Sequence, residues 1–486
     1  MAELLEVFEY RFTRLDPVRG DHIDPPTLAV YETLLTKGSD GLPRPGLAQS
    51  WEVSADGLTW DLRLRDGARF HSGRLCDAAA VLEGLELCRW GDALPRQVWY
   101  WDPVDTMFVR DTRTVSLRLR HPCPRLPVLL WGTHTAIVNA ETWRSHGASF
   151  GADFADGTGD YRLASYSPES VIVERVDPLP TRPDTIRWRS VVDDDERESI
   201  ARSSRADVVR QVPGMRTAPE PGWTLDEQLE NSQFYLALNF NDPRGFTDPV
   251  LRRCFDAFID RDDLLHTAFD GRGDARRSPI PAADEFAGAY DPALVRPMSR
   301  DEARRQLDAL GWEPGPDGVL ERRGTSLSID AVAQDTAACR RLAASLARQL
   351  RPAGIDLRFT FAELFESFYR AVEAGPAAFL NKWLWSDAME AVYGFCRTDC
   401  IEPAGGNWQQ SSCPAVDSAF DLFREAADPD SLQTASGEVQ RAFMRELPYI
   451  PLVSPVETLA VGPAVRGFGL APRTLYPSYD EVQVTL

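Results

Sequence analysis

Alternating apolar and polar positions predict a β-hairpin within residues 46–74. Trp60, Leu62 and Leu64 alternate with charged residues, which is the two-residue period of a half-buried strand. A second apolar and polar alternation precedes them, and the turn between the two runs contains Gly57. Because glycine tolerates a positive φ, this position suits a tight turn. We therefore expect an antiparallel ribbon in this part of the chain.

The same reasoning predicts strands and helices that alternate along the rest of the chain. The segments with strand character are 4–12, 161–175 (a hairpin), 186–192, 206–212, 233–240, 355–361 and 377–385. The segments with helical periodicity or helix capping signals are 78–90, 249–266, 299–311, 336–350 and two helices within 414–446. This alternation is typical of the α/β class.

Two apolar segments predict how the chain is divided. Residues 233–240 (QFYLALNF) form a nearly continuous apolar run, and strand character returns at 449–460 after a second α/β unit. We interpret these segments as two crossings between lobes, which would form a two-strand hinge beside a ligand cleft. Lobe one would comprise 1–238 and be completed by 456–486, and lobe two would comprise 239–455.

Charge excludes several classes of partner. The chain has 486 residues and a formal net charge of −21. Phosphate groups favour clustered positive charge, so we expect no nucleic-acid partner and no anionic membrane surface. No run of residues approaches the roughly 20 apolar residues of a membrane span. We therefore expect no transmembrane segment.

The start of the chain and its cysteines bear on location. Residues 1–17 lack the basic region, apolar stretch and cleavage site of a signal peptide. As written, this predicts a cytoplasmic protein, or a periplasmic or extracellular one if a leader was removed. Cys396, Cys400 and Cys413 cluster in sequence. They are expected to be packed thiols, with a disulfide or a metal site as the alternative.

Catalytic and cofactor motifs are not evident. The six histidines are dispersed without metal-ligand spacing, and no phosphate-binding loop or dinucleotide fingerprint occurs. We expect no metal and no cofactor. The segment 147–151 (GASFG) matches the nucleophile-elbow pattern, but a helix-like segment precedes it where that motif needs a strand. We interpret the match as a coincidence, so no catalytic residue is assigned.

The order of several segments resembles the family 5 extracellular solute-binding proteins, the dipeptide, oligopeptide and nickel receptors of ABC importers. The match extends over nearly the whole chain, and the hairpin segment 45–73 is its most specific part. The matching segments are 15–17, 31–35, 45–73, 157–166, 236–269, 405–423 and 447–452.

This resemblance implies a two-lobed, periplasmic-binding-protein-like fold of type II, cluster C, with an accessory subdomain at about 26–155. It implies the substrate-binding component of an ABC importer, a monomer that closes on a peptide-like or other small organic solute and meets an ABC permease. The alternative is a cytosolic protein that reuses the fold as an enzyme or a ligand sensor. Asp387 and Glu390 are the only carboxylates we would nominate for catalysis, so the enzyme question stays open.

Candidate ligand-binding residues follow from the resemblance. In peptide-binding members, a strand of lobe two ends in Trp and a carboxylate that pairs with the amino group of the ligand, and Asp387 occupies that place here. The tryptophans stand two and four positions before it rather than three. Trp383 and Trp385 would share one face of a regular strand, either as a ligand wall or as core.

Two further segments complete the candidate set. Trp408 and Asn407 follow two glycines, which permit a close approach of the backbone to a ligand. Asn239 lies at the end of the apolar run 233–240.

Overall fold

The computed structural model describes residues 2–20, 24–38, 41–90, 99–291, 293, 295–383, 385, 387–470, 479 and 482–485. The chain forms two compact units. Unit 1 consists of Met1–Gln228 and Glu457–Leu486, and unit 2 is Leu229–Val456. The first boundary between the units therefore follows Gln228, before the apolar run 233–240, whereas the predicted end of lobe one was residue 238. Part of the predicted closing segment of lobe one, 471–478, lies outside the described residues.

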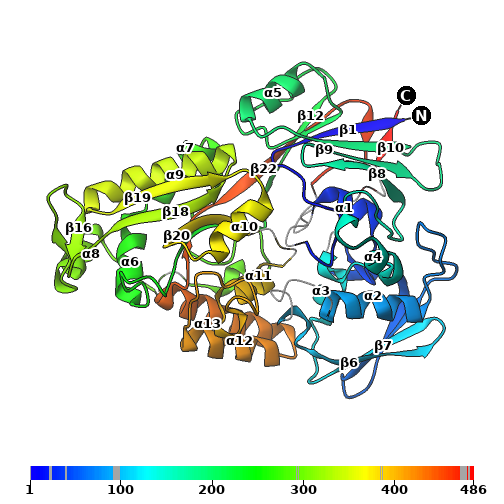
Figure 1. Ribbon diagram of the computed structural model, residues 1–486, viewed down its shortest axis with the longest axis horizontal. Helices are drawn as coiled ribbons and strands as arrows, with labels where there is room; N and C mark the ends of the chain where they lie inside the picture. Colours follow the sequence, from blue (N-terminus) through cyan, green and yellow to red (C-terminus); the bar gives the residue numbers. More distant parts are fainter. Residues whose placement is uncertain are drawn as a thin grey trace. The chain divides into compact units, whose positions relative to one another are not determined.

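The larger sheet of unit 1 is mixed (Figure 1). Its strands are β1 (Glu3–Phe8), β8 (Tyr161–Ser167), β9 (Ser170–Arg175), β10 (Thr185–Ser190), β11 (Val208–Arg210), β12 (Thr224–Leu229) and β22 (Ser454–Val461). They are ordered β12-β22-β11-β1-β10-β9-β8, with β1 parallel to both neighbours. β8 and β9 form the predicted hairpin. The chain passes between the units within β12 and β22, which are neighbours in this sheet.

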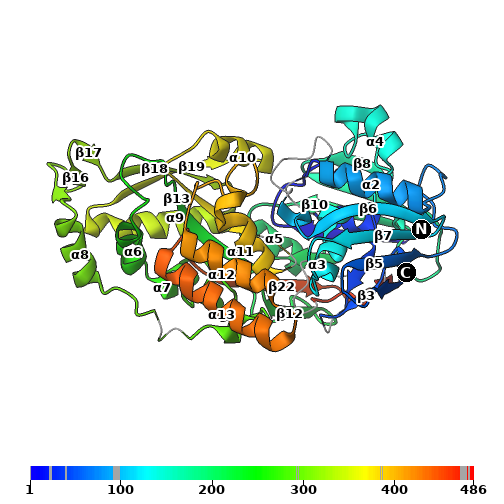
Figure 2. The ribbon, with the colours of Figure 1, turned by 90° about the horizontal axis from the view of Figure 1, so that it is seen from below.

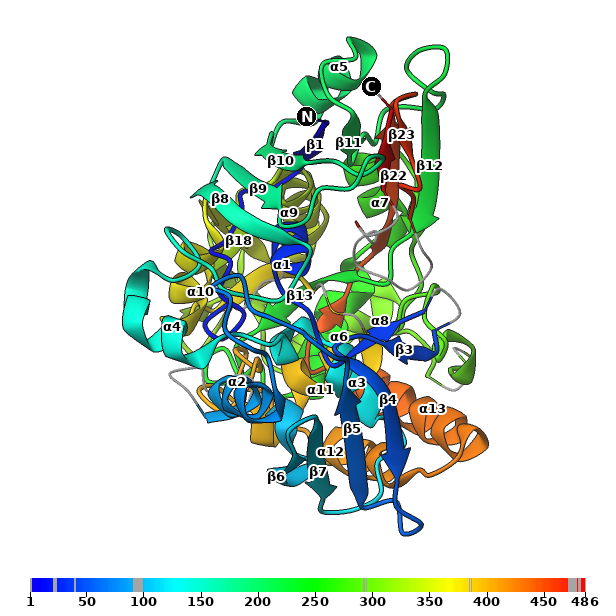
Figure 3. The same cartoon turned by 90° about the vertical axis from the view of Figure 1, so that its right-hand side faces the viewer.

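A separate four-stranded sheet in unit 1 contains the hairpin predicted within residues 46–74 (Figure 3). Its elements are β4 (Ala48–Val53), β5 (Thr59–Leu64), β6 (Val104–Asp111), β7 (Thr114–Leu119) and the adjoining helix α2 (Ala78–Trp90). Trp60, Leu62 and Leu64 are buried, as their alternation predicts. Gly57 has a φ of 71° in the turn between β4 and β5. The predicted ribbon is therefore present.

Short elements complete unit 1. They are α1 (Pro25–Val30), β2 (Leu35–Lys37), β3 (Pro43–Pro45), α3 (Leu126–Trp131), η2 (Thr133–Thr135), α4 (Ala140–His146), η3 (Gly147–Ser149), α5 (Asp194–Arg202), β23 (Val465–Arg466) and β24 (Gln483–Val484). Ser149 lies in a 3-10 turn directly after α4. A nucleophile elbow needs a strand before the serine, so the GASFG segment does not form one.

Unit 2 is built on a five-stranded sheet ordered β19-β18-β20-β13-β21. Its strands are β13 (Gln233–Leu238), β18 (Ser328–Gln334), β19 (Asp356–Ala362), β20 (Ala378–Trp383) and β21 (Ile450–Pro451). β13 runs antiparallel to β20 and β21, and all of its residues are buried. The apolar run is thus a central strand of unit 2, because it has a strand on each side and a packed layer on each face.

Helices cover this sheet. They are α6 (Pro249–Phe258), α7 (Arg261–Phe269), α8 (Arg300–Ala309), α9 (Ala337–Leu350), α10 (Phe365–Glu373), α11 (Ala388–Cys396), α12 (Pro414–Glu425) and α13 (Pro429–Glu446). The small elements are β14 (Gly273–Asp274), η4 (Ala287–Ala289), β15 (Glu313–Pro314), β16 (Leu320–Arg322), β17 (Thr325–Ser326), η6 (Arg351–Ala353) and η7 (Thr398–Cys400). Figure 2 shows α11, α12 and α13 grouped together.

The two faces of the β13–β20 pair pack differently. Phe234, Leu236 and Leu238 join an apolar core with residues of α6, α7 and α9. On the other face, Tyr235 packs against aromatic rings of β20 and α11, including Phe395 at 6.2 Å between ring centroids. We call this second side the aromatic face of unit 2.

The helical segment predicted at 249–266 is two helices rather than one. α6 ends at Phe258, and the side chain of Asp260 accepts a hydrogen bond from the backbone N–H of Asp263 at 3.1 Å. This is an N-cap for α7, and such a cap requires a residue in an extended conformation. The continuous helical pattern concealed a break that Asp260 itself creates.

The described residues show no metal cluster and no disulfide. Cys396, Cys400 and Cys413 are free and buried, and no group of three or more His, Cys, Asp or Glu in the described ranges could hold a metal ion. Burial raises the pKa of the Cys413 thiol to about 12, which is typical of a packed structural thiol. Among the helices described, none has the length and apolar character needed to cross a membrane.

Candidate functional site

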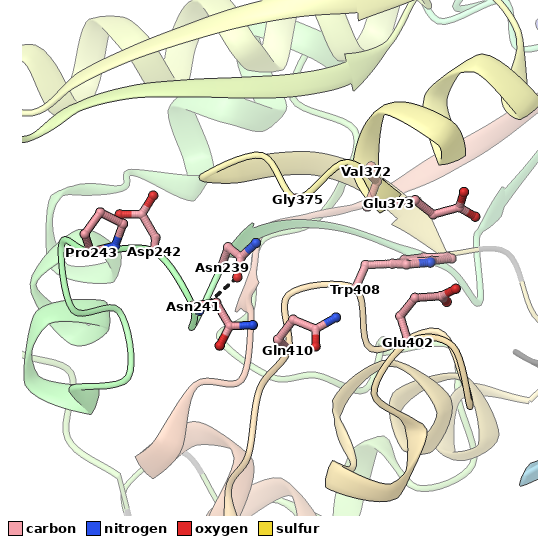
Figure 4. A pocket seen from close by; sticks show the side chains of 10 residues that line it. All are labelled: Asn239, Asn241, Asp242, Pro243, Val372, Glu373, Gly375, Glu402, Trp408 and Gln410. Carbon is pink, nitrogen blue, oxygen red and sulfur yellow. Dashed lines mark hydrogen bonds between the residues drawn. The ribbon is translucent and has the colours of Figure 1, made fainter.

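Unit 2 contains a pocket of about 350 Å³ (Figure 4). We call it the Trp408 pocket. Its lining residues are Asn239, Asn241, Asp242, Pro243, Val372, Glu373, Gly375, Glu402, Trp408 and Gln410. This volume suits a small molecule or one side chain of a larger ligand. Two of the candidate residues from the sequence, Asn239 and Trp408, are therefore brought together.

Asn239 borders the pocket directly after the last residue of β13. Its backbone N–H donates to the carbonyl oxygen of Ala377 at 2.9 Å, and its side-chain amide donates to that of Pro376 at 3.2 Å. Its Oδ1 accepts the backbone N–H of Asn241 at 2.9 Å. These bonds fix the bend by which the chain leaves the sheet, so Asn239 shapes the rim of the pocket.

Trp408 forms part of the wall on the aromatic face. Its ring centroid lies 4.9 Å from that of Tyr369 and 5.7 Å from that of Phe395. Trp408 is only 5% exposed, so most of its surface packs in the core and a small part borders the pocket. The backbone N–H of Phe240 donates to the carbonyl oxygen of Gln409 at 2.8 Å, which holds this loop against the end of β13.

Packing and hydrogen bonds within the loop around Trp408 account for its two glycines and for Asn407. A Cβ at Gly405 would lie 2.6 Å from atoms of Cys400, and one at Gly406 would lie 2.7 Å from the ring of Phe395. The glycines are therefore required by packing within the loop, not by approach to a ligand. Asn407 is fully buried, and its amide donates to the carbonyl oxygens of Arg397 and Ser411 at 2.8 Å each.

Carboxylates give the pocket its chemical character. In Figure 4 the carboxylates of Glu373 and Glu402 lie beside the Trp408 ring. Asp242 is held by two bonds from Arg244 at 2.8 and 2.9 Å, which neutralise its charge. An aromatic surface with carboxylates and amides favours hydrogen-bond donors and cationic groups on a ligand.

A second polar region lies at the opposite end of β20. The strand ends at Trp383, and Leu384 and Ser386 lie outside the described residues. Trp383 is 1% exposed, whereas Trp385 is half-buried and contacts Phe395 at 6.1 Å between ring centroids. The two tryptophans do not share a strand face as we expected, because the strand ends between them. Trp383 is a core residue.

Asp387 begins the helix α11 in this second region. Its Oδ1 accepts the backbone N–H of Glu390 at 3.0 Å, so it is the N-cap of the helix. It is 5% exposed. The positive end of the helix dipole favours a carboxylate at this place. Asp387 is thus a buried, oriented acid rather than a solvated residue at a strand end.

The structure adds three residues that the sequence analysis missed. Asn231, Gln233 and Asp284 are buried, and the amide of Asn231 donates to Oδ2 of Asp284 at 3.1 Å. Burial raises the pKa of Asp284 to about 6, and the charge of Asp387 adds to this increase. The only signal in the sequence was a polar triplet, Asn231 to Gln233, at the start of an otherwise apolar strand.

The predicted residues thus fall in two regions. Asn239 lies beyond the end of β20 that begins with Ala378, while Asp387 and Trp385 follow its other end at Trp383. Six residues at about 3.3 Å each separate the two ends by roughly 17–20 Å. One small ligand does not fill both regions, whereas an extended one could reach both.

Comparison with known families identifies the chain. Residues 43–399, more than half of the chain, match the profile of the bacterial extracellular solute-binding proteins, family 5. The chain belongs to this family. The prediction made from the ordered sequence segments is therefore confirmed. Proteins of family 5 act with ABC importers, so the chain is the solute-binding component of such an importer rather than a cytosolic enzyme or sensor that reuses the fold.

A curated relative supports the family 5 assignment along the whole chain. The glutathione-binding protein GsiB of Salmonella paratyphi A is 25% identical over 494 residues, with 97% of this chain and 93% of the relative covered. GsiB of Escherichia coli K12 is likewise 25% identical, over 492 residues, with 96% and 92% covered.

Solved structures confirm the fold expected of family 5. The oligopeptide-binding protein AppA of Bacillus subtilis, solved with a nonapeptide, has a TM-score of 0.89 at 16% identity, and the match covers 100% of this chain and 99% of AppA. AgaA of A. tumefaciens R10, solved with agropinic acid, has a TM-score of 0.86 at 19% identity, with 100% and 99% covered. The predicted α/β, periplasmic-binding-protein-like fold is therefore confirmed.

Proposed function

We propose that this family 5 protein binds a small organic solute with a free amino group, of which peptide-like molecules are the main class. The observation that carries this proposal is Asp387, a carboxylate that is almost fully buried and oriented at the start of α11. A buried carboxylate is stabilised by a paired cation, and the ammonium group of a ligand supplies one. The names of the relatives, which bind glutathione or a nonapeptide, are consistent with this class.

We assign the remaining candidate residues within this proposal. Trp385 lies half-buried beside Asp387 and would provide an apolar contact. Asn239 and Trp408 would contact a distal part of an extended solute through the Trp408 pocket. Trp383 and Asn407 are buried in the core of unit 2, so they would act by positioning their neighbours.

Several properties of the whole protein belong to the proposal as well. Units 1 and 2 would be the two lobes, with 26–155 as an accessory subdomain of lobe one, and β12 and β22 would form the hinge. The protein would work outside the cytoplasm as a monomer and deliver its solute to an ABC permease. Lobe closure stays a prediction. It would appear in small-angle X-ray scattering as a smaller radius of gyration when solute is added.

Native mass spectrometry of the purified protein tests the function directly. We expect a monomer that carries a small amine-bearing molecule. Calorimetric titration with glutathione and with a pool of tripeptides would then measure affinity. Asp387→Asn should lower the affinity about 30-fold or more, because it leaves the ligand cation without its buried partner.

The Asp387→Asn variant should still fold, because asparagine caps a helix as well as aspartate does. Asp399→Asn, a change at another aspartate of unit 2 that is exposed, is the matched control and should bind like the wild type. The proposal is wrong if no solute co-purifies and neither glutathione nor the tripeptide pool binds the wild-type protein.

A further inference from the structure

A hydrogen-bonded hub in unit 2 holds the turn that carries Asp284. The amide of Gln440 on α13 donates to the carbonyl oxygen of Phe286 at 2.9 Å and to the hydroxyl of Ser436 at 3.2 Å. Its Oε1 accepts from the hydroxyl of Ser278 at 3.0 Å. The Ser436 hydroxyl lies 3.6 Å from the sulfur of Met389 on α11. The hub therefore connects the Asp284 turn with the helix that Asp387 caps.

The same hub reaches the first residue of β13. The side-chain amide of Gln233 donates to the carbonyl oxygen of Ser278 at 2.9 Å. Two residues earlier, Asn231 directs its amide at Asp284. Gln233 is 1% exposed and Asn231 is 8% exposed. Among the described residues, neither Oε1 of Gln233 nor Oδ1 of Asn231 has a hydrogen-bond donor.

This region is therefore rich in acceptors. It holds two carboxylates, Asp284 and Asp387, which are 8% and 5% exposed, and two amide oxygens without a donor. A buried acceptor that lacks a donor destabilises the folded state, so natural sites of this kind are satisfied by water, an ion or a ligand. Asn231 and Gln233 distinguish this region from a simple pair of acids, because each buries an amide oxygen that has no donor among the described residues.

We infer that Asp284 is a second cation-holding residue of the solute site and works with Asp387 to select a solute that bears an ammonium or guanidinium group. The inference rests on the proposed function and adds to it the residue that sets charge specificity. A cationic group with several N–H donors can satisfy both carboxylates and the two amide oxygens together, whereas a hydroxyl or a methyl group cannot.

The electrostatic surroundings of Asp284 determine how the affinity for a cationic solute changes with pH. Its pKa is raised to about 6, first by burial and then by the charge of Asp387, with a smaller contribution from its neighbour Glu285. Bonds from the backbone N–H of Phe286 and from Asn231 act in the opposite direction. Without solute the carboxyl group therefore holds a proton below pH 6. A bound cation favours the charged form, so binding should release a proton and affinity should rise with pH.

Calorimetry with matched probes tests the inference. The probes are a pool of tripeptides with free amino termini and the same pool after N-acetylation, each measured at pH 5 and pH 7. The wild-type protein should bind the free-amine pool about tenfold more tightly at pH 7 than at pH 5. It should bind the acetylated pool at least about tenfold more weakly. Titration at pH 6 in two buffers of different ionisation enthalpy should show proton release.

Asp284→Asn is the decisive variant. An asparagine can still accept from Phe286, and its amide can bond Asn231 if that side chain turns over, so the turn should be retained. The variant should lose about tenfold or more of its affinity for the free-amine pool and most of its pH dependence. Glu285→Gln, which removes an exposed carboxylate next to it, is the matched control and should bind like the wild type.

The possible outcomes separate the two proposals. If the wild type binds the free-amine pool but Asp284→Asn binds it equally well with the same pH profile, the role of Asp284 is wrong and the proposed function stands. Equal binding of the acetylated pool overturns both the selection of a cation and the free amino group in the proposed function, whereas no proton release by the wild type overturns only the role of Asp284. If the wild type binds neither pool at either pH, the proposed function itself fails.

Discussion

Unit 1 and unit 2 each bury a carboxylate whose pKa is raised, but they surround it in different ways. In unit 1, Glu6 is fully buried, and its Oε2 accepts from Trp188 at 2.8 Å and from the Tyr479 hydroxyl at 2.7 Å. Arg210 lies 3.8 Å from Glu6 and forms a direct ion pair with Glu457. We call these five residues the Glu6 cluster. It contains its own cation, Arg210, although Oε1 of Glu6 has no hydrogen-bond donor among the described residues.

The region around Asp284 in unit 2 is different, because the charged group that most affects Asp284 is another carboxylate. Its neighbours are a second carboxylate, Asp387, and amide groups of which two oxygens have no donor among the described residues. The Glu6 cluster serves the architecture, since a cation of the fold, Arg210, lies within ion-pair distance of both of its carboxylates. A group of buried acceptors that includes two carboxylates indicates a site in which a ligand supplies the donors. The comparison predicts opposite responses to mutation in the two regions.

The largest effect is expected when the cation of the Glu6 cluster is removed. Arg210→Met leaves Glu6 and Glu457 buried without a positive charge, and breaking a buried pair from one side costs about 3–5 kcal/mol. Urea denaturation measures this loss in the free energy of unfolding. Arg187→Met, which removes an exposed pair with Glu3 on the same sheet, should cost at most about 1 kcal/mol. Equal losses for both variants would contradict the comparison.

The pH dependence of stability should isolate Glu6. Burial raises its folded-state pKa from 4.5 to about 7, so the folded protein holds this proton more tightly than the unfolded chain. Its contribution is fully present below about pH 4.5 and is lost as pH rises through about 7, a decrease of about 3 kcal/mol. Glu6→Gln should flatten the profile of unfolding free energy in this window. A parallel profile for variant and wild type would show that Glu6 keeps an ordinary pKa.

The sequence was sufficient where a local pattern determines the structure. The alternation of Trp60, Leu62 and Leu64 predicted their burial in β5, and the helical pattern at 336–350 predicted α9. The break between α6 and α7 was missed because apolar periodicity continues across Asp260, and only the cap reveals it. Local pattern therefore predicts which elements exist better than where they end.

The candidate site was less predictable because it depends on packing between distant segments. Trp408 and Asn239 were selected for separate reasons, and the fold brings them to one pocket. Asp284 follows a proline-rich segment without periodicity, and its burial arises only when α13 and the hub at Gln440 cover the turn. The expectation that Trp383 and Trp385 share one strand face was wrong because the length of β20 was overestimated by two residues, from 385 to 383. Such features follow from tertiary contacts that no single segment encodes.

A smaller loss is expected when the hub that supports the region around Asp284 is removed. Gln440→Leu leaves the Ser278 hydroxyl and the Phe286 carbonyl without their partner, which should cost about 1–3 kcal/mol. Affinity for the free-amine tripeptide pool should also fall, because the turn that carries Asp284 loosens. Gln433→Leu on the exposed side of the same helix should change stability by less than about 0.5 kcal/mol. Lost stability with unchanged affinity would separate the hub from the site.

The smallest change in stability is expected at Asp284, the residue to which we assign the selection of a cationic solute. Without solute at pH 8, Asp284 is charged and is repelled by Asp387, and its raised pKa means that the charged form opposes folding. Asp284→Asn resembles the protonated acid, so the free energy of unfolding at pH 8 should stay equal or rise by up to about 1 kcal/mol. Urea denaturation of Asp284→Asn and of Arg210→Met under the same conditions compares the free energies of unfolding of the two variants. A loss above about 2 kcal/mol would mean that Asp284 serves the fold as Glu6 does, because a residue reserved for a ligand should not be needed to hold the empty protein together.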